Sequence, residues 1–230
     1  MQIVKPVALI TDAQTPLGEA LIRLYLAQGC AVAATRSNQQ ATESPLVSRS
    51  EDLLLIDWSR RSPISTRNVL LSALNRFGRI DETLLLLSPS LERGLLHELS
   101  YETVERAVDT WIKGSLFLLK SVVEVYRKQP SESPPLLGLV GASTQEEGSA
   151  VPPLEAALRG SFEAVARSLL AAYDGENLRV CGFEGFGAQP EAFAQFIVES
   201  LSARPGRAAG RIQRFPTRGG LLGSLKAGRP

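Results

Sequence analysis

The chain has 230 residues, of which 44% are hydrophobic and 21% charged, and its formal net charge is +1. These values are ordinary for a soluble globular protein, and the length suits one α/β domain, which we place at residues 1–220, before a basic tail over residues 221–230. The longest apolar runs are far too short to span a bilayer, and the N-terminal segment lacks the charged leader and apolar stretch of a secretory signal. We therefore predict a cytoplasmic protein without membrane contact.

Residue patterns along the first half predict alternating strands and helices. Apolar runs predict strands over residues 6–11, 31–35, 53–56 and 83–87. Apolar spacing predicts helices over residues 17–28 and 65–77, the second capped by Ser65, and Gly29 and Gly78 close them as C-terminal caps. Residues 37–50 are polar and are predicted to form a loop or a weak helix.

The second half continues the alternation. Strands are predicted over residues 136–141, 178–183 and 211–215, and helices over residues 101–127, 153–173 and from Pro190 onward. Ser100 caps the first of these helices, and Pro152 and Pro153 suit the first turn of the second. Short apolar strands alternating with helices are typical of βαβ units. The sequence therefore predicts an α/β fold with a doubly wound, mostly parallel Rossmann-type sheet of about seven strands flanked by helices.

Basic residues are concentrated near the C-terminal end. Residues 200–230 contain seven basic and no acidic residues, which leaves 18 basic against 24 acidic residues in the rest of the chain. Such asymmetry occurs in nucleic-acid-binding tails, but this segment has a single aromatic residue and no helical basic stripe, so nucleic acid is not a predicted partner. Docking onto the acidic remainder of the same or a neighbouring subunit explains the segment equally well.

Metal-binding patterns are missing from the sequence. The two cysteines, Cys30 and Cys181, lie in or beside apolar strand-like stretches, so both are predicted to be buried free thiols. The one histidine, His97, lies among polar residues and is predicted to be solvated. Without a cysteine pair at ligand spacing, no zinc or other metal site is predicted.

Six segments resemble, in chain order, parts of the short-chain dehydrogenase/reductase (SDR) family. They are VALITDAQTPLGEALIRLYLAQGCAVAATRS, GRIDETLLLLSPS, DTWIKGSLFLLKS, PPLEAALRGSFEAVARSLLAAY, LRVCGFEGF and AAGRIQRFPTRGG. In the family these correspond to the first βαβ unit, the fourth strand, the helix with the catalytic asparagine, the helix of the Tyr-x-x-x-Lys motif, the sixth strand and the closing strand. The match spans about residues 5 to 220 and implies a Rossmann domain of the NAD(P)-binding kind.

The family's phosphate-binding turn, Thr-Gly-x-x-x-Gly-x-Gly, is only partly retained. By the resemblance, its positions are occupied by Thr11, Asp12, Pro16 and Gly18. In such a turn the first glycine permits the bend, the second lets the backbone approach the pyrophosphate, and the third allows close helix–strand packing. Asp12 places a carboxylate where a diphosphate would lie, and Pro16 lacks an N–H donor. We therefore predict that packing is kept and phosphate binding is lost.

Two residues still favour a nucleotide. Arg36 follows the second strand, where NADP-preferring relatives often hold the 2′-phosphate, and Asp57 follows the third strand at the family's adenine-contacting aspartate. The alternatives are a solvated charge for Arg36 and a strand-end turn residue for Asp57. NADP is thus a candidate cofactor, held by Thr11, Gly18, Arg36 and Asp57, although we expect no cofactor.

None of the family's four catalytic residue types is retained. The resemblance places Trp111 at the asparagine, Ala142 at the serine with Ser143 beside it, Glu155 at the tyrosine and Arg159 at the lysine. A carboxylate is a poor proton donor at neutral pH, and arginine cannot relay protons. Glu155 and Arg159, four apart on one helix, are predicted to form a helix-surface salt bridge. A new acid–base role for Glu155 is the alternative.

The segment that forms a substrate lid in the family is also short. Family members usually carry a mobile loop of a few tens of residues between the sixth strand and the last helix. Here GFEGFGAQPEAFAQFI leaves about six residues between the predicted strand and helix, which is little material to shield a reaction from water.

These losses predict a non-catalytic, SDR-like binding or assembly subunit. In the family, the long helices near residues 101–127 and 153–173 pair between subunits, which implies a homo-oligomer (dimer or tetramer) or a hetero-oligomer with an active SDR. Small and apolar residues on the second helix suit such contacts, or else pack on the sheet: Ala156, Ala157, Gly160, Ala164 and Leu169.

Two alternatives stay open. One is an NADP-dependent short-chain oxidoreductase with an atypical site that uses Ser143, Thr144 or Glu155. The other is a sensing module that holds some other small molecule at the carboxyl ends of the strands.

Overall fold

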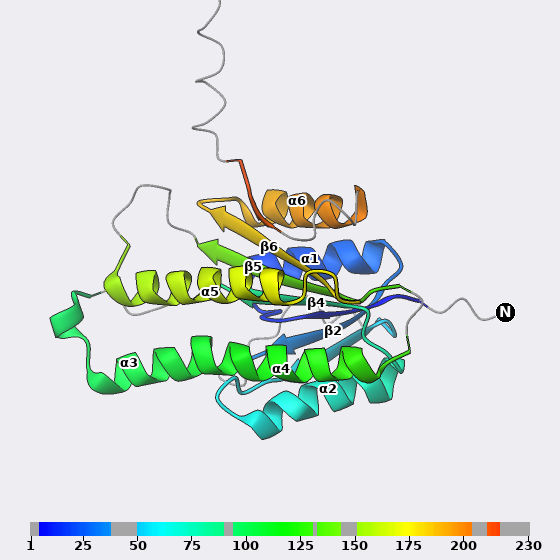
Figure 1. The fold of residues 1–230 in the computed structure, drawn as a ribbon, viewed down its shortest axis with the longest axis horizontal. Helices are drawn as coiled ribbons and strands as arrows, with labels where there is room; N and C mark the ends of the chain where they lie inside the picture. The colour runs from blue at the N-terminus through cyan, green and yellow to red at the C-terminus, as the bar shows by residue number, and fades with distance from the viewer. Residues whose placement is uncertain are drawn as a thin grey trace, which may run out of the picture.

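The structure is a computed structural model that describes residues 5–37, 50–89, 94–130, 133–143, 151–203 and 211–216 (Figure 1). Most of the polar segment 37–50 and the whole tail 221–230 lie outside the described residues. The predictions for these two segments, and the boundary of the domain at residue 220, therefore stay predictions.

Seven parallel strands form one sheet. They are β1 (Val7–Ile10), β2 (Ala31–Arg36), β3 (Leu53–Asp57), β4 (Glu82–Leu87), β5 (Leu136–Ser143), β6 (Arg179–Phe186) and β7 (Ile212–Arg214). Their order across the sheet is β3-β2-β1-β4-β5-β6-β7, and every neighbouring pair is parallel. This is the doubly wound order of a Rossmann sheet, so the predicted fold class is confirmed.

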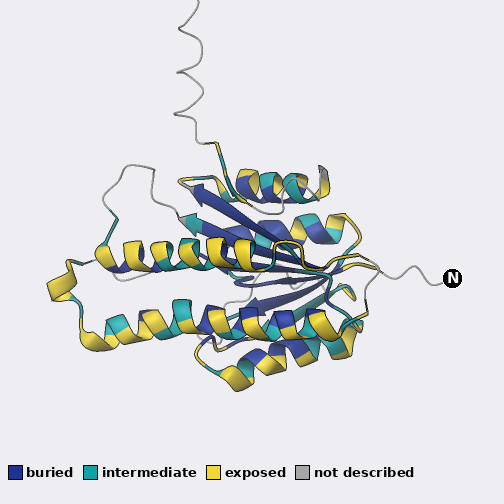
Figure 2. Cartoon of the chain, in the orientation of Figure 1, coloured by how far each residue is buried: buried dark blue, intermediate teal, exposed yellow. Residues whose placement is uncertain are grey.

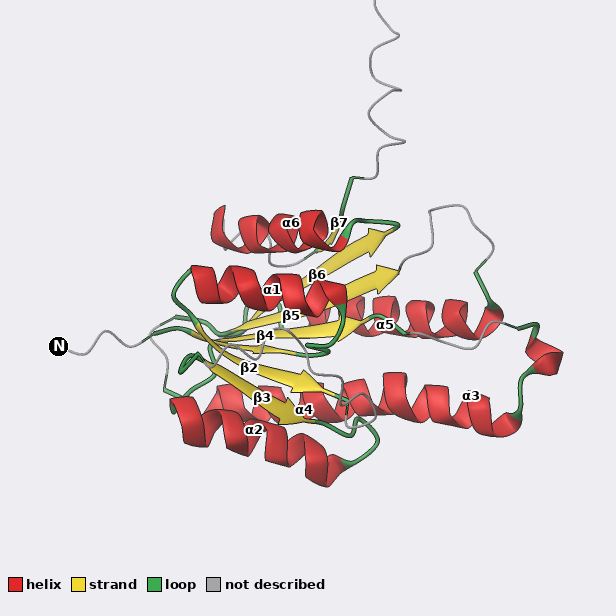
Figure 3. Ribbon diagram, turned by 180° about the vertical axis from the view of Figure 1, so that it is seen from behind, coloured by secondary structure: helices red, strands yellow, loops and turns green. Residues whose placement is uncertain are grey.

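Helices cover both faces of the sheet (Figures 1 and 3). On one face lie α1 (Pro16–Ala27) and α6 (Pro190–Ala203), and on the other lie α2 (Pro63–Phe77), α4 (Gly114–Lys128) and α5 (Pro153–Ala172). Strand residues alternate between the two cores: Ala8 and Ile10 pack on the first face, and Leu9 packs on the second. The central strands are therefore buried on both sides, as Figure 2 shows.

The helix predicted over residues 101–127 is interrupted. Ser100 caps α3 (Tyr101–Ala107) as predicted, because its side chain accepts the Thr103 N–H. The chain then passes through a π-helical segment, η2 (Val108–Lys113), into α4. Such segments are frequent at functional sites. With the short helix η1 (Leu96–Glu98), α3 projects beyond the carboxyl ends of the strands (Figures 1 and 3).

The start of α2 corrects one prediction. Its cap is Ser62, not Ser65: the Ser62 side chain accepts the Ser65 N–H, and Pro63 takes the first turn. Proline suits that position because the N–H it lacks would have no partner within the helix. The same pattern begins α1, where Thr15 is the cap and Pro16 is the first helical residue.

Candidate functional site

The carboxyl ends of β1 and β4 mark the switch point of the sheet. From β1 the strand order runs to β2 and β3 on one side, and β4 to β7 lie on the other side. Ligands of open α/β sheets bind just outside the carboxyl ends of the strands at such a point. Asp12 follows β1, and Leu86 lies near the end of β4. The side chains at this edge therefore decide what the site can bind.

The turn after β1 has the left-handed bend that the first glycine of a dinucleotide turn provides, but it carries a carboxylate. Asp12 has a φ of 57°, which glycine adopts freely and aspartate tolerates better than most residues. Its carbonyl oxygen accepts the Thr15 N–H at 2.9 Å and the Thr15 hydroxyl at 2.8 Å. Asp12 is only 6% exposed, so its carboxylate is inside the protein.

Arg60, which the sequence analysis did not single out, is the partner of Asp12. It follows β3, and its side chain is 7% exposed. Its Nη2 donates to Asp12 Oδ2 at 2.5 Å and to the carbonyl oxygen of Leu86 at 3.0 Å. One guanidinium thus spans the switch point from the end of β1 to the end of β4. Arginine is rarely buried this deeply without a charged partner.

Both tryptophans of the chain pack against this guanidinium. Its central carbon lies 4.5 Å from the ring centroid of Trp58 and 4.5 Å from that of Trp111, which is within the range of cation–π attraction. The indole N–H of Trp58 donates to Thr66 Oγ1 at 3.1 Å, and Trp111 comes from η2. We name Asp12, Trp58, Arg60 and Trp111 the arginine clasp.

Burial dominates the electrostatics of the arginine clasp. Burial raises the pKa of the Asp12 carboxyl above its ordinary value, and the charge and hydrogen bond of Arg60 act against this shift. A carboxylate buried without a counter-charge is strongly unfavourable, so Arg60 is what makes the ionised Asp12 tolerable. Arg60 Nη1 is buried and has no hydrogen-bond partner among the described residues. The pair is thus neutral overall but leaves one donor unmet.

Thr11 and Gly18 serve the packing of the same turn. A Cβ on Gly18 would collide with the carbonyl oxygen of Asp12, which fits the predicted packing role of the third glycine position. The Gly18 N–H donates to Thr15 Oγ1 at 3.1 Å. Thr11 is fully buried, and its hydroxyl accepts the Leu86 N–H at 2.8 Å, so it joins β1 to β4. Pro16 offers no N–H at all, which leaves the start of α1 poor in free donors.

Arg36 and Asp57 are neighbours at the carboxyl ends of β2 and β3. They are paired in the strand register, and Arg36 Nε donates to Asp57 Oδ1 at 2.7 Å. Their side chains are 39% and 50% exposed, so the pair is accessible from solvent. The two candidate nucleotide-binding side chains are therefore brought together, each as the other's partner.

Glu155 and Arg159 form the predicted ion pair in the first turns of α5, but its predicted place on the helix surface is wrong. Glu155 is only 8% exposed. The reason is that α5 packs against η2, where Leu154 and Leu158 form a small core with Trp111. Glu155 is therefore engaged by Arg159 at a place that η2 covers.

The two remaining tetrad positions add no described functional group. Ala142 is half-buried near the carboxyl end of β5, and Ser143 is the last residue of that strand. The side chain of Ser143 lies outside the described residues, as does Thr144. The structure therefore brings together Trp111 and the start of α5, and in the described part of the chain the tyrosine and lysine positions of the tetrad hold Glu155 and Arg159.

The connection between β6 and α6 is shorter than predicted. β6 continues to Phe186, three residues beyond the predicted end, and α6 begins at Pro190. Only residues 187–189 lie between them. The strand extends because its end pairs with β5 up to Ser143. This connection is too short to cover a substrate.

The cysteines differ in environment. Cys181 is buried as predicted, but Cys30 is only partly buried, because it precedes β2 at the edge of the core. Burial raises the pKa of the Cys181 thiol to about 12 and also raises that of Cys30. Since the thiolate is the reacting form, neither thiol is activated.

We expect the folded protein to react with a disulfide reagent at pH 8 at Cys30 alone, and slowly, because Cys181 is buried and protonated. Counting the thiols that react before and after unfolding in guanidinium checks this. A Cys30→Ser variant serves as the control and is expected to show no reaction until it unfolds. Fast reaction of Cys181 in the folded variant would contradict the burial described above.

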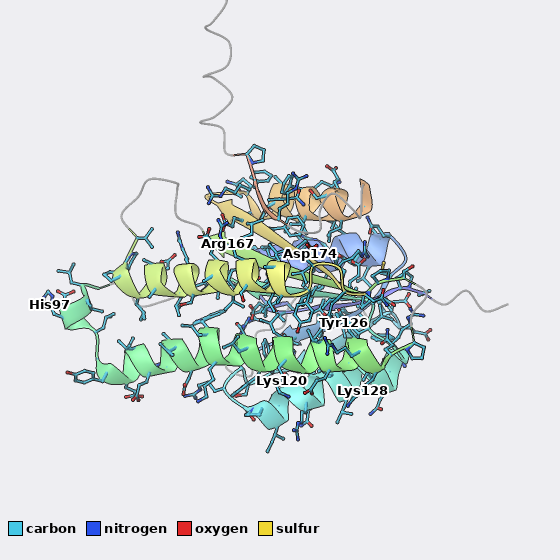
Figure 4. All side chains as sticks on the ribbon, viewed as in Figure 1. His97, Lys120, Tyr126, Lys128, Arg167 and Asp174 are labelled. Carbon is cyan, nitrogen blue, oxygen red and sulfur yellow. The ribbon has the colours of Figure 1, made fainter. Side chains whose placement is uncertain are left out.

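The described residues contain no cluster of side chains suited to a metal ion. No group of three or more histidine, cysteine, aspartate or glutamate side chains that could hold a metal ion occurs among the described residues. His97 is exposed in η1, at the tip that projects from the sheet (Figure 4). No helix within the described ranges is long and apolar enough to cross a membrane.

Comparison with known proteins adds a likeness of fold. No family model and no curated protein matches the sequence. Among solved structures, an SDR described as a glucose/ribitol dehydrogenase from Brucella melitensis is 17% identical with a TM-score of 0.77, and the match covers 94% of this chain and 97% of that one.

Two further solved structures contain a nicotinamide nucleotide. A 3-ketoacyl-(acyl-carrier-protein) reductase from Brucella melitensis in complex with NADH is 16% identical with a TM-score of 0.75, over 91% of this chain and 96% of that one. The NADH-dependent reductase A1-R′ in complex with NAD is 15% identical with a TM-score of 0.79, over 92% and 95%. The chain thus has an SDR-like Rossmann fold, and a nucleotide is a ligand that this fold can carry.

Proposed function

We propose that this SDR-like chain is not a dehydrogenase and that it acts by binding or assembly. The observation that carries the proposal is the arginine clasp, which occupies the switch point. A dinucleotide places its pyrophosphate at the turn after β1, against backbone N–H groups. Here that turn carries the buried Asp12 carboxylate, and Arg60 closes the distance to β4. These residues do not fit a pyrophosphate.

The chemistry of the tetrad positions supports the same proposal. Proton transfer to a substrate oxygen needs a group that can both give and take a proton near neutral pH. Glu155 is engaged by Arg159, and arginine keeps its charge. The short connection between β6 and α6 would leave any reaction open to water.

Calorimetric titration of the purified protein with NADPH, and with NADH for comparison, tests the proposal. We expect no binding tighter than about 100 µM, which corresponds to about −5.5 kcal/mol, and no thermal stabilisation by either nucleotide. Tighter binding together with oxidation of the reduced nucleotide on a carbonyl substrate would overturn the proposal.

Nucleotide binding with turnover would favour the second candidate, an NADP-dependent oxidoreductase with an atypical site. One observation supports it: Arg36 and Asp57 lie side by side and accessible at the sheet edge, where the adenosine half of such a nucleotide would sit. To bind the phosphate of such a nucleotide, Arg36 would have to release its hydrogen bond to Asp57. We expect a cytoplasmic location for either candidate function.

An outward face of α4 and α5 supports assembly with a second copy. Exposed apolar side chains lie along α3 to α4, with Val108 39% and Leu116 46% exposed. Beside them α5 presents small, exposed residues at every fourth position, Ala156, Gly160 and Ala164, and a shallow apolar groove separates the two helices. Leu169 instead packs on the core beneath α5. We name Val108, Leu116, Ala156, Gly160 and Ala164 the α4–α5 face. Figures 1 and 2 show α4 and α5 side by side, with exposed residues along both helices.

We expect a dimer or tetramer by light scattering at micromolar concentration, and we expect Leu116→Lys to shift it toward the monomer. A lysine in the middle of the α4–α5 face would bury a charge without a partner. The matched control is Leu71→Lys, since Leu71 is similarly exposed, at 55%, but lies on α2. A monomeric wild-type protein, or equal effects of both variants, would contradict this assembly. Co-purification of an active SDR would instead favour a hetero-oligomer.

A further inference from the structure

We infer that the arginine clasp takes over the structural role of a bound dinucleotide, tying the carboxyl edge of the sheet together and keeping the switch point closed in the absence of any ligand. This inference rests on the proposed function and goes one step further. It states that the fold still has the shape to admit a nucleotide and that the side chains of the clasp are what exclude it.

The clasp connects the elements that a dinucleotide would otherwise connect. Asp12 follows β1, Trp58 and Arg60 follow β3, the Leu86 carbonyl belongs to β4, and Trp111 comes from η2. In an open α/β sheet, a dinucleotide lies along these same carboxyl ends. The guanidinium, with its planar shape and its stacking on aromatic rings, bridges them within one chain.

The backbone beneath the clasp would accept a glycine at position 12. Asp12 adopts the left-handed conformation that glycine provides in dinucleotide turns, and Gly18 still permits α1 to approach its carbonyl oxygen. Replacing the Asp12 side chain with hydrogen would therefore leave the turn unstrained. The exclusion of a pyrophosphate by Asp12 and Arg60 therefore comes from side-chain atoms and not from the course of the chain, whereas Pro16 removes one N–H donor from the turn.

The loop of Arg60 is held from behind by the start of α4. A Cβ on Gly114 would lie 2.6 Å from the carbonyl oxygen of Arg60, so this glycine allows α4 to touch the loop directly. The guanidinium is held by its two hydrogen bonds, by its stacking on both tryptophans and by this packing, although its Nη1 has no hydrogen-bond partner among the described residues. This is what we expect of a guanidinium that occupies a site shaped for a nucleotide, because the site does not place an acceptor for each of its N–H groups.

The test is the double variant Asp12→Gly/Arg60→Ala, which removes both charges together and leaves no lone buried ion. Titrated with NADH and NADPH by calorimetry, it is expected to bind at least one of them with a Kd below about 1 mM, under conditions where wild-type protein shows no heat. The matched control is Arg61→Ala, which removes an exposed arginine from the next position and is expected to stay without binding.

Tryptophan emission gives an independent readout, because both tryptophans of the chain belong to the clasp. In the double variant we expect a shift of the emission to longer wavelength, and no shift in Arg61→Ala. If the double variant does not fold, Asp12→Gly/Arg60→Leu decides the question, since it removes the same two charges and places an apolar side chain between the tryptophans. It is then expected to gain the same nucleotide binding.

The outcomes separate this inference from the proposed function. Binding by the folded variant but not by wild type supports both. No binding by either protein, with the variant folded and its emission shifted, overturns the inference and leaves the proposed function standing. Binding by wild type overturns the proposed function, and with it the closure of the switch point.

Discussion

Replacing Arg60 with alanine is expected to lower the free energy of unfolding by about 3 to 5 kcal/mol, the range found when one partner of a buried ion pair is removed. The side chains of Arg60 and Asp12 are 7% and 9% exposed, so solvent screens the loss very little. The variant would also lose the hydrogen bond to the Leu86 carbonyl and the stacking on both tryptophans. Denaturant unfolding followed by circular dichroism measures the effect.

The effect should depend on pH in a direction that identifies Asp12 as its cause. Without Arg60, burial alone acts on the Asp12 carboxyl and raises its pKa further above the ordinary value. The folded variant then keeps a proton that the unfolded chain releases above about pH 4. Its stability therefore falls as the pH rises through this window, so the deficit relative to wild type is smallest near pH 4 and largest at pH 7.

Arg61→Ala is the matched control for this experiment. Arg61 is the next residue and is exposed, so its replacement is expected to change stability by less than about 0.5 kcal/mol. A second comparison is Asp12→Asn/Arg60→Ala, which should recover part of the loss because no buried charge is left alone. A deficit in Arg60→Ala that stays constant from pH 4 to pH 7 would show that Asp12 does not carry it.

The fold was open to prediction because its signals are local and repeated. Apolar runs such as residues 84–87 alternate with helical patterns, and each pattern survives small errors at its ends. The error at α2 is of this kind: a serine at position 62 or 65 can cap the same helix, and only the proline at 63 decides. The π-helical segment η2 was not predicted, since one extra residue in a turn shifts the apolar spacing by a single position, and residues 101–127 were interpreted as one continuous helix.

The residues that differ from the family's motifs were also visible in the sequence, but the contacts that they make were not. Asp12 and Trp111 could be placed by resemblance, one at a position where the family has a glycine and the other where it has an asparagine. That they meet at Arg60 depends on three segments far apart in the chain. One signal was available: residues that follow β1 and β3 share one edge of a parallel sheet, and they carried opposite charges. The same limit explains the burial of Glu155, which depends on where η2 packs and not on its own helix.

Gly18→Ala is expected to be the other severe substitution, with a loss of about 3 kcal/mol or more, at the upper end of overpacking effects. A Cβ at this position meets the carbonyl oxygen and carbon of Asp12, which are backbone atoms and cannot rotate away. Either α1 moves off the sheet or the turn at Asp12 opens. In both cases the Asp12 carboxylate moves away from the Arg60 guanidinium. The tryptophan emission should therefore change along with the unfolding midpoint.

The helical glycine Gly160 separates this steric cause from the general preference of helices for alanine. A Cβ on Gly160 meets no atom within 4 Å, so Gly160→Ala should stabilise an isolated subunit by about 0.5 to 1 kcal/mol through helix propensity. The two substitutions make the same chemical change with opposite expected signs. If Gly18→Ala proved as harmless as Gly160→Ala, the close approach of α1 to the Asp12 turn would be wrong. The turn beneath the arginine clasp would then have to differ from the one described.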